Sequence, residues 1–249
     1  MDFILFVISF IASFLFSLGG IGAAIILIPI MVYLGIPIST AKPIGLFFNT
    51  ISMAGASITN IKNKKIDFKI GIPIIISSFI FASIGAYLSK YIPVNVIILM
   101  FIIFLLFSGL MFLFYKKRDK TYTNKISYIK SILLGSFAGT ISGILGIGGG
   151  SIISPLMLMM GFNPKKTTAI TAFVIPFSSF SGFLTYWAMG NVNWRTLFIV
   201  SIAGTMGAIA GTIFMNKKLN SNITKKILAV ILLITAIKMI IDLLIKYNL

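Results

Sequence analysis

The chain has 249 residues, of which 58% are hydrophobic and 10% are charged, and it carries a formal net charge of +17. If this chain folded as a soluble domain, it would expose far more apolar surface than soluble domains tolerate. The composition therefore indicates a polytopic helical membrane protein. The chain has no cysteine and no histidine, which removes disulfides and the usual zinc and haem ligands. We therefore expect no metal ion and no other cofactor.

The positive charge is concentrated in short connectors between apolar runs. Lys and Arg collect in this way in the cytoplasmic loops of membrane proteins. The charge is therefore attributed to membrane topology, and no nucleic-acid partner is expected.

The first apolar stretch, residues 3–35, is interrupted by Gly19-Gly20-Ile21-Gly22. As one helix it would be about 50 Å long, whereas the apolar core of a bilayer is about 30 Å thick. Glycine also disfavours the interior of a helix. The sequence therefore predicts two short helices, over 3–18 and 23–34, joined at the glycines as a hairpin that is either re-entrant or fully spanning.

Three longer apolar runs follow, at 38–61, 70–89 and 93–115. The first of them contains Asn49 and Ser52, which are three residues apart and therefore share one helix face. Lys42 lies near its beginning, on the predicted outer side. We interpret it as an interfacial lysine that extends its ammonium group to water; the alternative is that it draws anions to the outer mouth of the protein. Each run is long enough to predict a membrane-spanning helix.

A basic connector, residues 116–125, separates two halves of similar pattern. The predicted organisation is a first transmembrane repeat at 1–115, a cytoplasmic connector, and a second transmembrane repeat at 126–249. Apolar runs in the second half lie at 127–145, 151–161, 167–189, 195–215 and 224–247. Gly20, Gly22, Pro29 and Gly35 align without a gap with Gly146, Gly148, Pro155 and Gly161, an offset of 126 residues.

The distribution of basic residues predicts how the two halves are oriented. If each broken segment returns to its starting side, and the connector at 62–69 is inside, most Lys and Arg residues lie inside. The equivalent connector at 188–195 then lies outside. The predicted fold is all-α, with two inverted-topology repeats, each a glycine-broken hairpin plus three spanning helices. Both termini would be extracytoplasmic.

The paired breaks also predict a binding site. A helix N-terminus offers free N–H groups to an anion, and new helices begin after the breaks, at Ala23 and Ser151. No carboxylate lies near the predicted midplane, which argues against a proton pump or cation exchanger. The candidate substrate-binding residues are Gly20, Gly22, Asn49 and Ser52 in the first half, and Gly146, Gly148, Gly149, Gly150, Ser151, Thr168 and Thr171 in the second. The alternative is that these glycines and hydroxyls serve only helix packing.

The second half also carries a family resemblance. Its sequence Gly146-Ile147-Gly148-Gly149-Gly150-Ser151-Ile152-Ile153-Ser154-Pro155-Leu156, followed by Gly161-Phe162-Asn163-Pro164-Lys165-Lys166, resembles the signature of the TauE/SafE sulfite exporter family, also called the 4-toluene sulfonate uptake permease family. The first half has a weaker copy, in which Ala23 and Ala24 replace two glycines and Lys42-Pro43 replaces small residues. The resemblance implies transport of sulfur-containing or organic anions across the cytoplasmic membrane.

The sequence thus predicts a secondary transporter, with export of sulfite or an organosulfonate as the default. Its expected partners are the small anion and the lipid bilayer, and a homo-oligomer is left open. Two alternatives are an uptake permease for such anions and a non-transporting membrane assembly factor, which dry, apolar contact between the breaks would favour. An enzyme is not expected, because cysteine, histidine and a buried carboxylate pair are all missing from the sequence pattern.

Overall fold

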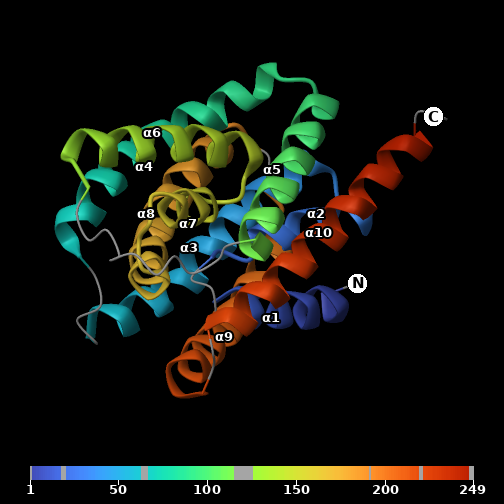
Figure 1. Cartoon of the computed structure of the whole chain (residues 1–249). Helices are drawn as coiled ribbons and strands as arrows, with labels where there is room; N and C mark the ends of the chain where they lie inside the picture. The colour runs from blue at the N-terminus through green and yellow to red at the C-terminus, as the bar shows by residue number, and fades with distance from the viewer. Residues whose placement is uncertain are drawn as a thin grey trace.

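The computed structural model describes residues 2–17, 21–62, 67–114, 126–190, 192–218 and 221–246. All regular elements in these ranges are helical (Figure 1), which confirms the all-α prediction. The first half contains α1 (Asp2–Ser17), α2 (Ala24–Tyr33), α3 (Ile38–Lys62), α4 (Phe68–Leu88), a short 3₁₀ helix η1 (Ser89–Tyr91) and α5 (Val94–Phe114). The second contains α6 (Tyr128–Leu145), α7 (Gly150–Met159), α8 (Pro164–Ala188), α9 (Trp194–Lys218) and α10 (Ser221–Lys246).

The order and length of the helices follow the sequence repeat. Both α2 and α7 have 10 residues, and both α3 and α8 have 25. Each of these second-half helices begins 126 residues after its counterpart. The basic connector at 116–125 lies outside the described residues.

Each glycine-broken stretch forms two helices, as predicted: α1 and α2 in the first half, and α6 and α7 in the second. In the second half, Gly146 caps α6 in the left-handed conformation, with φ +80°, and its amide donates to the carbonyl of Ser142 at 2.7 Å. Glycine is favoured here because a Cβ is strained at such a φ. At about 1.5 Å per residue, α2 and α7 are each only about 15 Å long.

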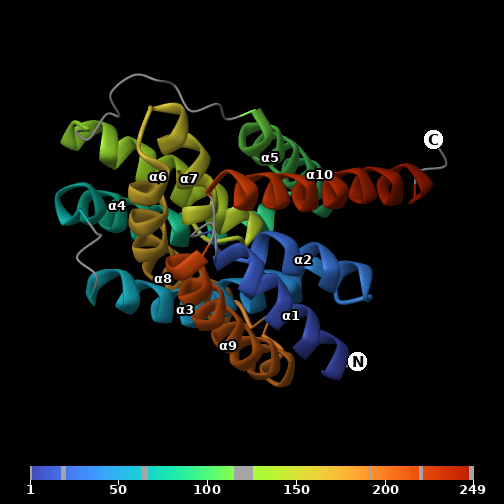
Figure 2. The same cartoon turned by 60° about the horizontal axis from the view of Figure 1, so that its bottom comes forward.

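Helices of the first half pack mainly against helices of the second half (Figure 1 and Figure 2). Helix α4 packs along α6, and α1 packs along α9. Glycines permit both contacts: a Cβ at Gly85 would overlap the carbonyl of Thr140, and a Cβ at its counterpart Gly211 would overlap that of Phe14. Helices α3 and α8 contact each other; α3 also packs against α9, and α8 packs against α4, while α5 and α10 lie side by side at one edge. The packing is therefore symmetric under exchange of the halves.

Several helices in the described ranges have the length and composition of membrane spans. Six meet this criterion: Phe68–Tyr91, Val94–Phe114, Tyr128–Leu145, Lys166–Ala188, Trp194–Phe214 and Lys226–Ile245. Many large apolar side chains on them face outward, as expected of surfaces in contact with lipid. The protein is therefore a multi-pass membrane protein.

Two ion pairs mark opposite ends of the central helix α8. Near its beginning, Lys166 Nζ lies 2.8 Å from Asp67 Oδ2, at the start of α4. Beyond its end, Arg195 Nη2 donates to Asp2 Oδ2 at 2.6 Å. The connectors that contain Asp67 and Arg195 are equivalent in the repeat, and α8 separates them by its length of about 37 Å. The inverted orientation itself remains a prediction.

Candidate functional site

Asn49 of α3 connects the two glycine breaks. Its side chain is fully buried. Its Oδ1 accepts a hydrogen bond from the amide of Ala24, the first residue of α2, at 3.1 Å. Its Nδ2 donates to the carbonyl of Ile147 in the second break, at 2.7 Å. One carboxamide therefore joins segments that lie about 120 residues apart in the chain.

Two glycines make this close approach possible. A Cβ at Gly22 would overlap the carboxamide of Asn49. Gly148 has φ +76°, and a Cβ there would overlap Ser179 Oγ and lie 3.0 Å from Asn49 Nδ2. The backbone of both breaks is thus in direct contact with polar side chains.

The second break has its own hydroxyl cap. The amide of Gly149, which precedes α7, donates to Ser178 Oγ at 3.1 Å. Next along the chain, a Cβ at Gly150 would overlap Ile175, which occupies the repeat position of Asn49. The acceptors at the starts of the two helices therefore differ: the amide of Ala24 at α2 donates to a carboxamide, and the amide of Gly149 at α7 donates to a serine hydroxyl.

Buried hydroxyl groups near the breaks lack partners. The side chains of Ser52 and Ser179 are fully buried, and within the described residues neither Oγ has a hydrogen-bond partner. A buried hydroxyl without a partner is able to bind a polar group, although hydroxyls elsewhere, such as those of Ser9 and Ser108, also lack a partner within the described residues. Ser179 adjoins Gly148 directly. The sequence placed Ser52 in the candidate site, whereas Ser179 was not singled out.

The remaining candidates fall into two groups. Gly20 lies outside the described residues. Ser151 is buried in the first turn of α7, and its hydroxyl donates to the carbonyl of Ile147 at 3.2 Å. The hydroxyl of Thr171 donates within α8, to the carbonyls of Thr167 and Thr168, while its own carbonyl lies against Gly150. Thr168 is half-buried one turn earlier.

The interpretation of Lys42 as an interfacial lysine that reaches water was wrong. Its side chain is only 4% exposed, because α6, α8 and the end of α4 close over it. Its Nζ donates to Ser89 Oγ at 3.2 Å and to the carbonyl of Ile144 at 3.4 Å. The ammonium also lies 4.9 Å from the ring centre of Tyr186. Gly146 packs on Lys42, because a Cβ there would lie 2.7 Å from Lys42 Cβ.

Tyr186 of α8 is buried beside Lys42. It is 2% exposed, and its hydroxyl donates to the carbonyl of Gly143 at 2.9 Å and contacts Ser89 Oγ at 2.7 Å. Helical spacing offered one signal for this cluster. Lys42 precedes Asn49 by seven residues, which puts both on one face of α3.

The site is positive and polar. In the described part of the chain, each carboxylate forms an ion pair elsewhere: Asp2 with Arg195, Asp67 with Lys166, and Asp242 with Lys238. No group of potential metal ligands occurs among the same residues. Amides, hydroxyls and one ammonium can bind an oxyanion.

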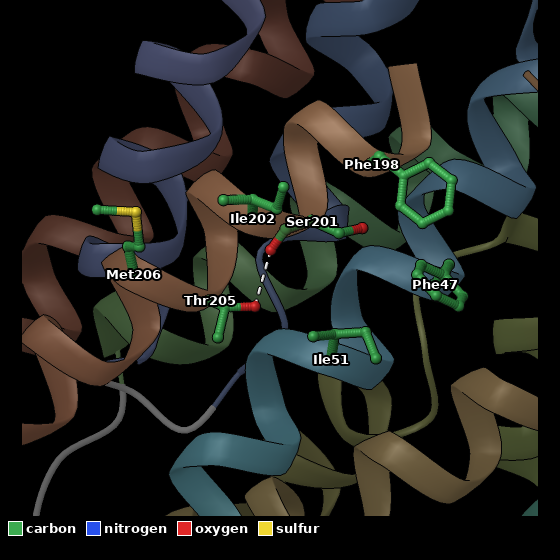
Figure 3. A pocket seen from close by; sticks show the side chains of 7 residues that line it. All are labelled: Phe47, Ile51, Phe198, Ser201, Ile202, Thr205 and Met206. Atoms are coloured by element: carbon green, nitrogen blue, oxygen red, sulfur yellow. Dashed lines mark hydrogen bonds between the residues drawn. The ribbon is translucent and has the colours of Figure 1, made fainter. Parts of the chain in front are cut away.

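A separate apolar hollow of about 410 Å³ lies between α3 and α9 (Figure 3). Phe47 and Ile51 line it from α3, two residues on either side of Asn49, and therefore from the opposite helix face. The lining is largely exposed and apolar, and the hydroxyl of Thr205 is bonded to the carbonyl of Ser201 at 2.7 Å. This hollow is not part of the site around the breaks.

Comparison with known proteins gives a consistent result. A family model described as "Sulfite exporter TauE/SafE" matches residues 5–239. The chain is 28% identical to the probable membrane transporter protein YunE of Bacillus subtilis, over 95% of this chain and 96% of that protein. It is 29% identical to a probable membrane transporter protein of Methanocaldococcus jannaschii, over 92% and 90% of the two chains. No solved structure matches.

Proposed function

Because the chain belongs to the TauE/SafE sulfite exporter family, a family of membrane transporters by the names of its relatives, we propose that it exports a small anion such as sulfite or an organosulfonate. The proposed site lies between the two halves, where the glycine breaks meet. It comprises the candidate residues predicted from the sequence, with Ser178 and Ser179 added.

The observation that carries this proposal is the contact of Asn49 with both breaks. Its carboxamide binds the amide of Ala24 and the carbonyl of Ile147. An oxyanion that replaced Asn49 Oδ1 at the start of α2 would meet a free N–H group and the positive end of a helix dipole. Ser52 and Ser179 supply unpartnered hydroxyls for its other oxygens. The site therefore offers donors without a competing carboxylate.

Transport requires the substrate to reach this site from each side in turn. The packing is symmetric under exchange of the halves, as expected of a transporter in which one repeat moves against the other. A negative cell interior favours anion efflux by about 2.3 kcal/mol per charge at 100 mV. Export therefore needs no coupled cation, whereas uptake by a permease would need one.

The assembly-factor alternative is less well supported. Dry, apolar contact between the breaks would favour it. The contact instead contains a buried carboxamide and buried serine hydroxyls. Polar groups at this depth are costly without a function.

The direct test is anion flux in lipid vesicles that contain the purified protein. Sulfite and methanesulfonate would be measured at imposed membrane potentials, and flux should rise when the potential drives the anion outward. Vesicles that move neither anion faster than protein-free vesicles would overturn the proposal. Flux that requires a cation gradient and runs inward would favour the uptake permease.

A pair of glycine variants locates the site. Gly148→Ala places a Cβ against Ser179 and Asn49, whereas Gly190→Ala has a similar φ of +82° with no atom within 4 Å. Both should lose about 1–2 kcal/mol of stability from the left-handed backbone. Only Gly148→Ala should lower the flux per folded molecule, by about tenfold or more. Equal flux in the two variants would exclude Gly148 from the transport path.

A further inference from the structure

We propose that Lys42, together with Ser89 and Tyr186, forms a second anion-binding subsite at one end of the translocation path. Its ligand would be the charged oxyanion group of the transported molecule, a sulfonate or sulfite group. For this substrate class the inference rests on the proposed function.

The first argument is the unbalanced charge of Lys42. The ammonium is buried, and its contacts are a serine hydroxyl, a backbone carbonyl and an aromatic ring, all of them neutral. The described carboxylates are all paired elsewhere. A buried charge is costly unless an opposite charge accompanies it, and ionisable groups within membrane proteins commonly mark ion pathways. An anion arriving at Lys42 would supply the missing charge.

The second argument is the position of Lys42 relative to the central site. Lys42 and Asn49 share one face of α3, separated by about 10 Å along the helix axis. The second break lies along this same face, with Gly146 against Lys42 and Gly148 beside Asn49. An anion leaving the amide of Ala24, beside Asn49, could therefore follow one face of α3 to the ammonium of Lys42.

The third argument is the route to the surface. Ser89, which accepts from Lys42, is followed by the exposed Lys90, whose ammonium lies 3.7 Å from the ring centre of Tyr87. Two positive charges thus occur in succession, one at the surface and one buried. The repeat counterpart of Lys42 is Thr168, which is uncharged. The subsite is therefore specific to the end of the molecule where α3 begins.

The contact with Ile144 also suggests a structural role, because a cation stabilises the carboxyl end of a helix, here α6. Lys42→Gln separates the two roles. Glutamine keeps hydrogen-bond donors for Ser89 Oγ and the carbonyl of Ile144, and it removes the charge. Lys130→Gln is the matched control, since it removes an exposed charge at the start of α6, about 20 Å along this helix from Ile144.

The experiment measures the thermal stability of the purified protein in sodium sulfite, sulfate, thiosulfate and methanesulfonate, each against sodium chloride at equal ionic strength. At least one oxyanion should raise the Tm of the wild type in a saturable way. Lys42→Gln should weaken that binding by about tenfold or more, while Lys130→Gln should change it less than threefold. If Lys42→Gln does not fold, Tyr186→Phe, which keeps the ring and removes the hydroxyl, should weaken binding about threefold.

Two results would overturn the subsite. One is a Lys42→Gln protein that is stabilised by the same anion with unchanged affinity. The other is a wild type that no oxyanion stabilises more than chloride does. Sulfite flux in vesicles distinguishes failure of the subsite from failure of the proposed function. If wild type and Lys42→Gln move sulfite equally well, the proposed function stands and the subsite does not. If anion binding depends on Lys42 but neither protein moves sulfite, the subsite stands and the proposed function does not.

Discussion

Asn49 shows how one side chain can hold an irregular backbone in the interior of a membrane protein. The break before α2 leaves amides without helical partners, and the second break leaves carbonyls. In a lipid environment such groups must be satisfied by the protein. Asn49 satisfies one of each, at Ala24 and at Ile147.

Replacing Asn49 with Leu should therefore destabilise the protein and reduce transport. Leucine has a similar size but leaves two buried backbone groups unpaired, each costing about 1–3 kcal/mol. Thr50→Val is the control, because the hydroxyl of Thr50 bonds only within its own helix, to the carbonyl of Leu46 at 2.9 Å. Thermal unfolding in detergent, compared with sulfite flux, measures both effects. A leucine variant as stable as Thr50→Val would show that Asn49 does not hold the breaks.

The sequence indicated which residues lie at or near the glycine breaks better than it predicted their contacts. Helical spacing put Asn49 and Ser52 on one face, and the repeat located both breaks. The same spacing could not show that Gly22 and Gly148 meet the same carboxamide, because that depends on how α2 and α7 dock on α3 and α8. Lys42 was misplaced for a related reason, since its burial comes from helices remote in sequence.

At the scale of helices, the structure follows the hydrophobic pattern closely. Glycine clusters end α6 and precede α7, and the apolar runs match the observed helices to within a few residues. Glycine contacts between helices were harder to foresee. Gly85 and Gly211 lie at equivalent positions of the sequence repeat, yet only the structure shows that each lies against a backbone carbonyl of the other half.

Gly85→Ala and Gly211→Ala should destabilise the protein to a similar degree, by about 1–3 kcal/mol each. Each added methyl would overlap a backbone carbonyl, which cannot move without shifting a helix. Gly55→Ala is the control, because its nearest contact is the side chain of Ile209 at 3.3 Å. That variant should be neutral or slightly stabilising through helix propensity. Thermal unfolding of the three proteins under one condition provides the comparison.

The ion pair between Asp67 and Lys166 links the start of α4 to the start of α8. Partial burial alone would raise the pKa of Asp67, but the hydrogen bond and charge of Lys166, with the amides of Lys69 and Ile70, hold this pKa below its ordinary value of 3.8. At pH values above 3.8, the ionised carboxylate of Asp67 therefore stabilises the fold. Its contribution is lost as the pH falls through the lower, folded-state pKa.

Stability should consequently fall at acidic pH in a way that depends on Asp67. Asp67→Asn should reduce the loss of Tm between about pH 5 and pH 2. Asp242→Asn is the control, because Asp242 forms an exposed pair with Lys238 at 3.8 Å, and such pairs contribute little. Identical pH profiles for wild type and Asp67→Asn would show that the pair across the halves does not stabilise the protein.

For the whole molecule, the main open prediction is the inverted orientation of the repeats. Lys69 and Arg195 occupy equivalent positions, are both exposed, and lie at the two ends of α8. The chain has no cysteine, so Lys69→Cys and Arg195→Cys each give a single reactive thiol. A membrane-impermeant maleimide should label Arg195→Cys in intact cells and Lys69→Cys only after permeabilisation. Labelling of both from one side would contradict the inversion.

The exchanged packing of α1 with α9 and of α4 with α6 bears on how such a chain can originate. A polypeptide containing one half alone would leave the glycine-lined face of its fourth helix uncovered, and a second copy would be required to cover it. The arrangement is that of two intertwined subunits joined in one polypeptide. Separately expressed halves would then be stable only as a reassembled pair.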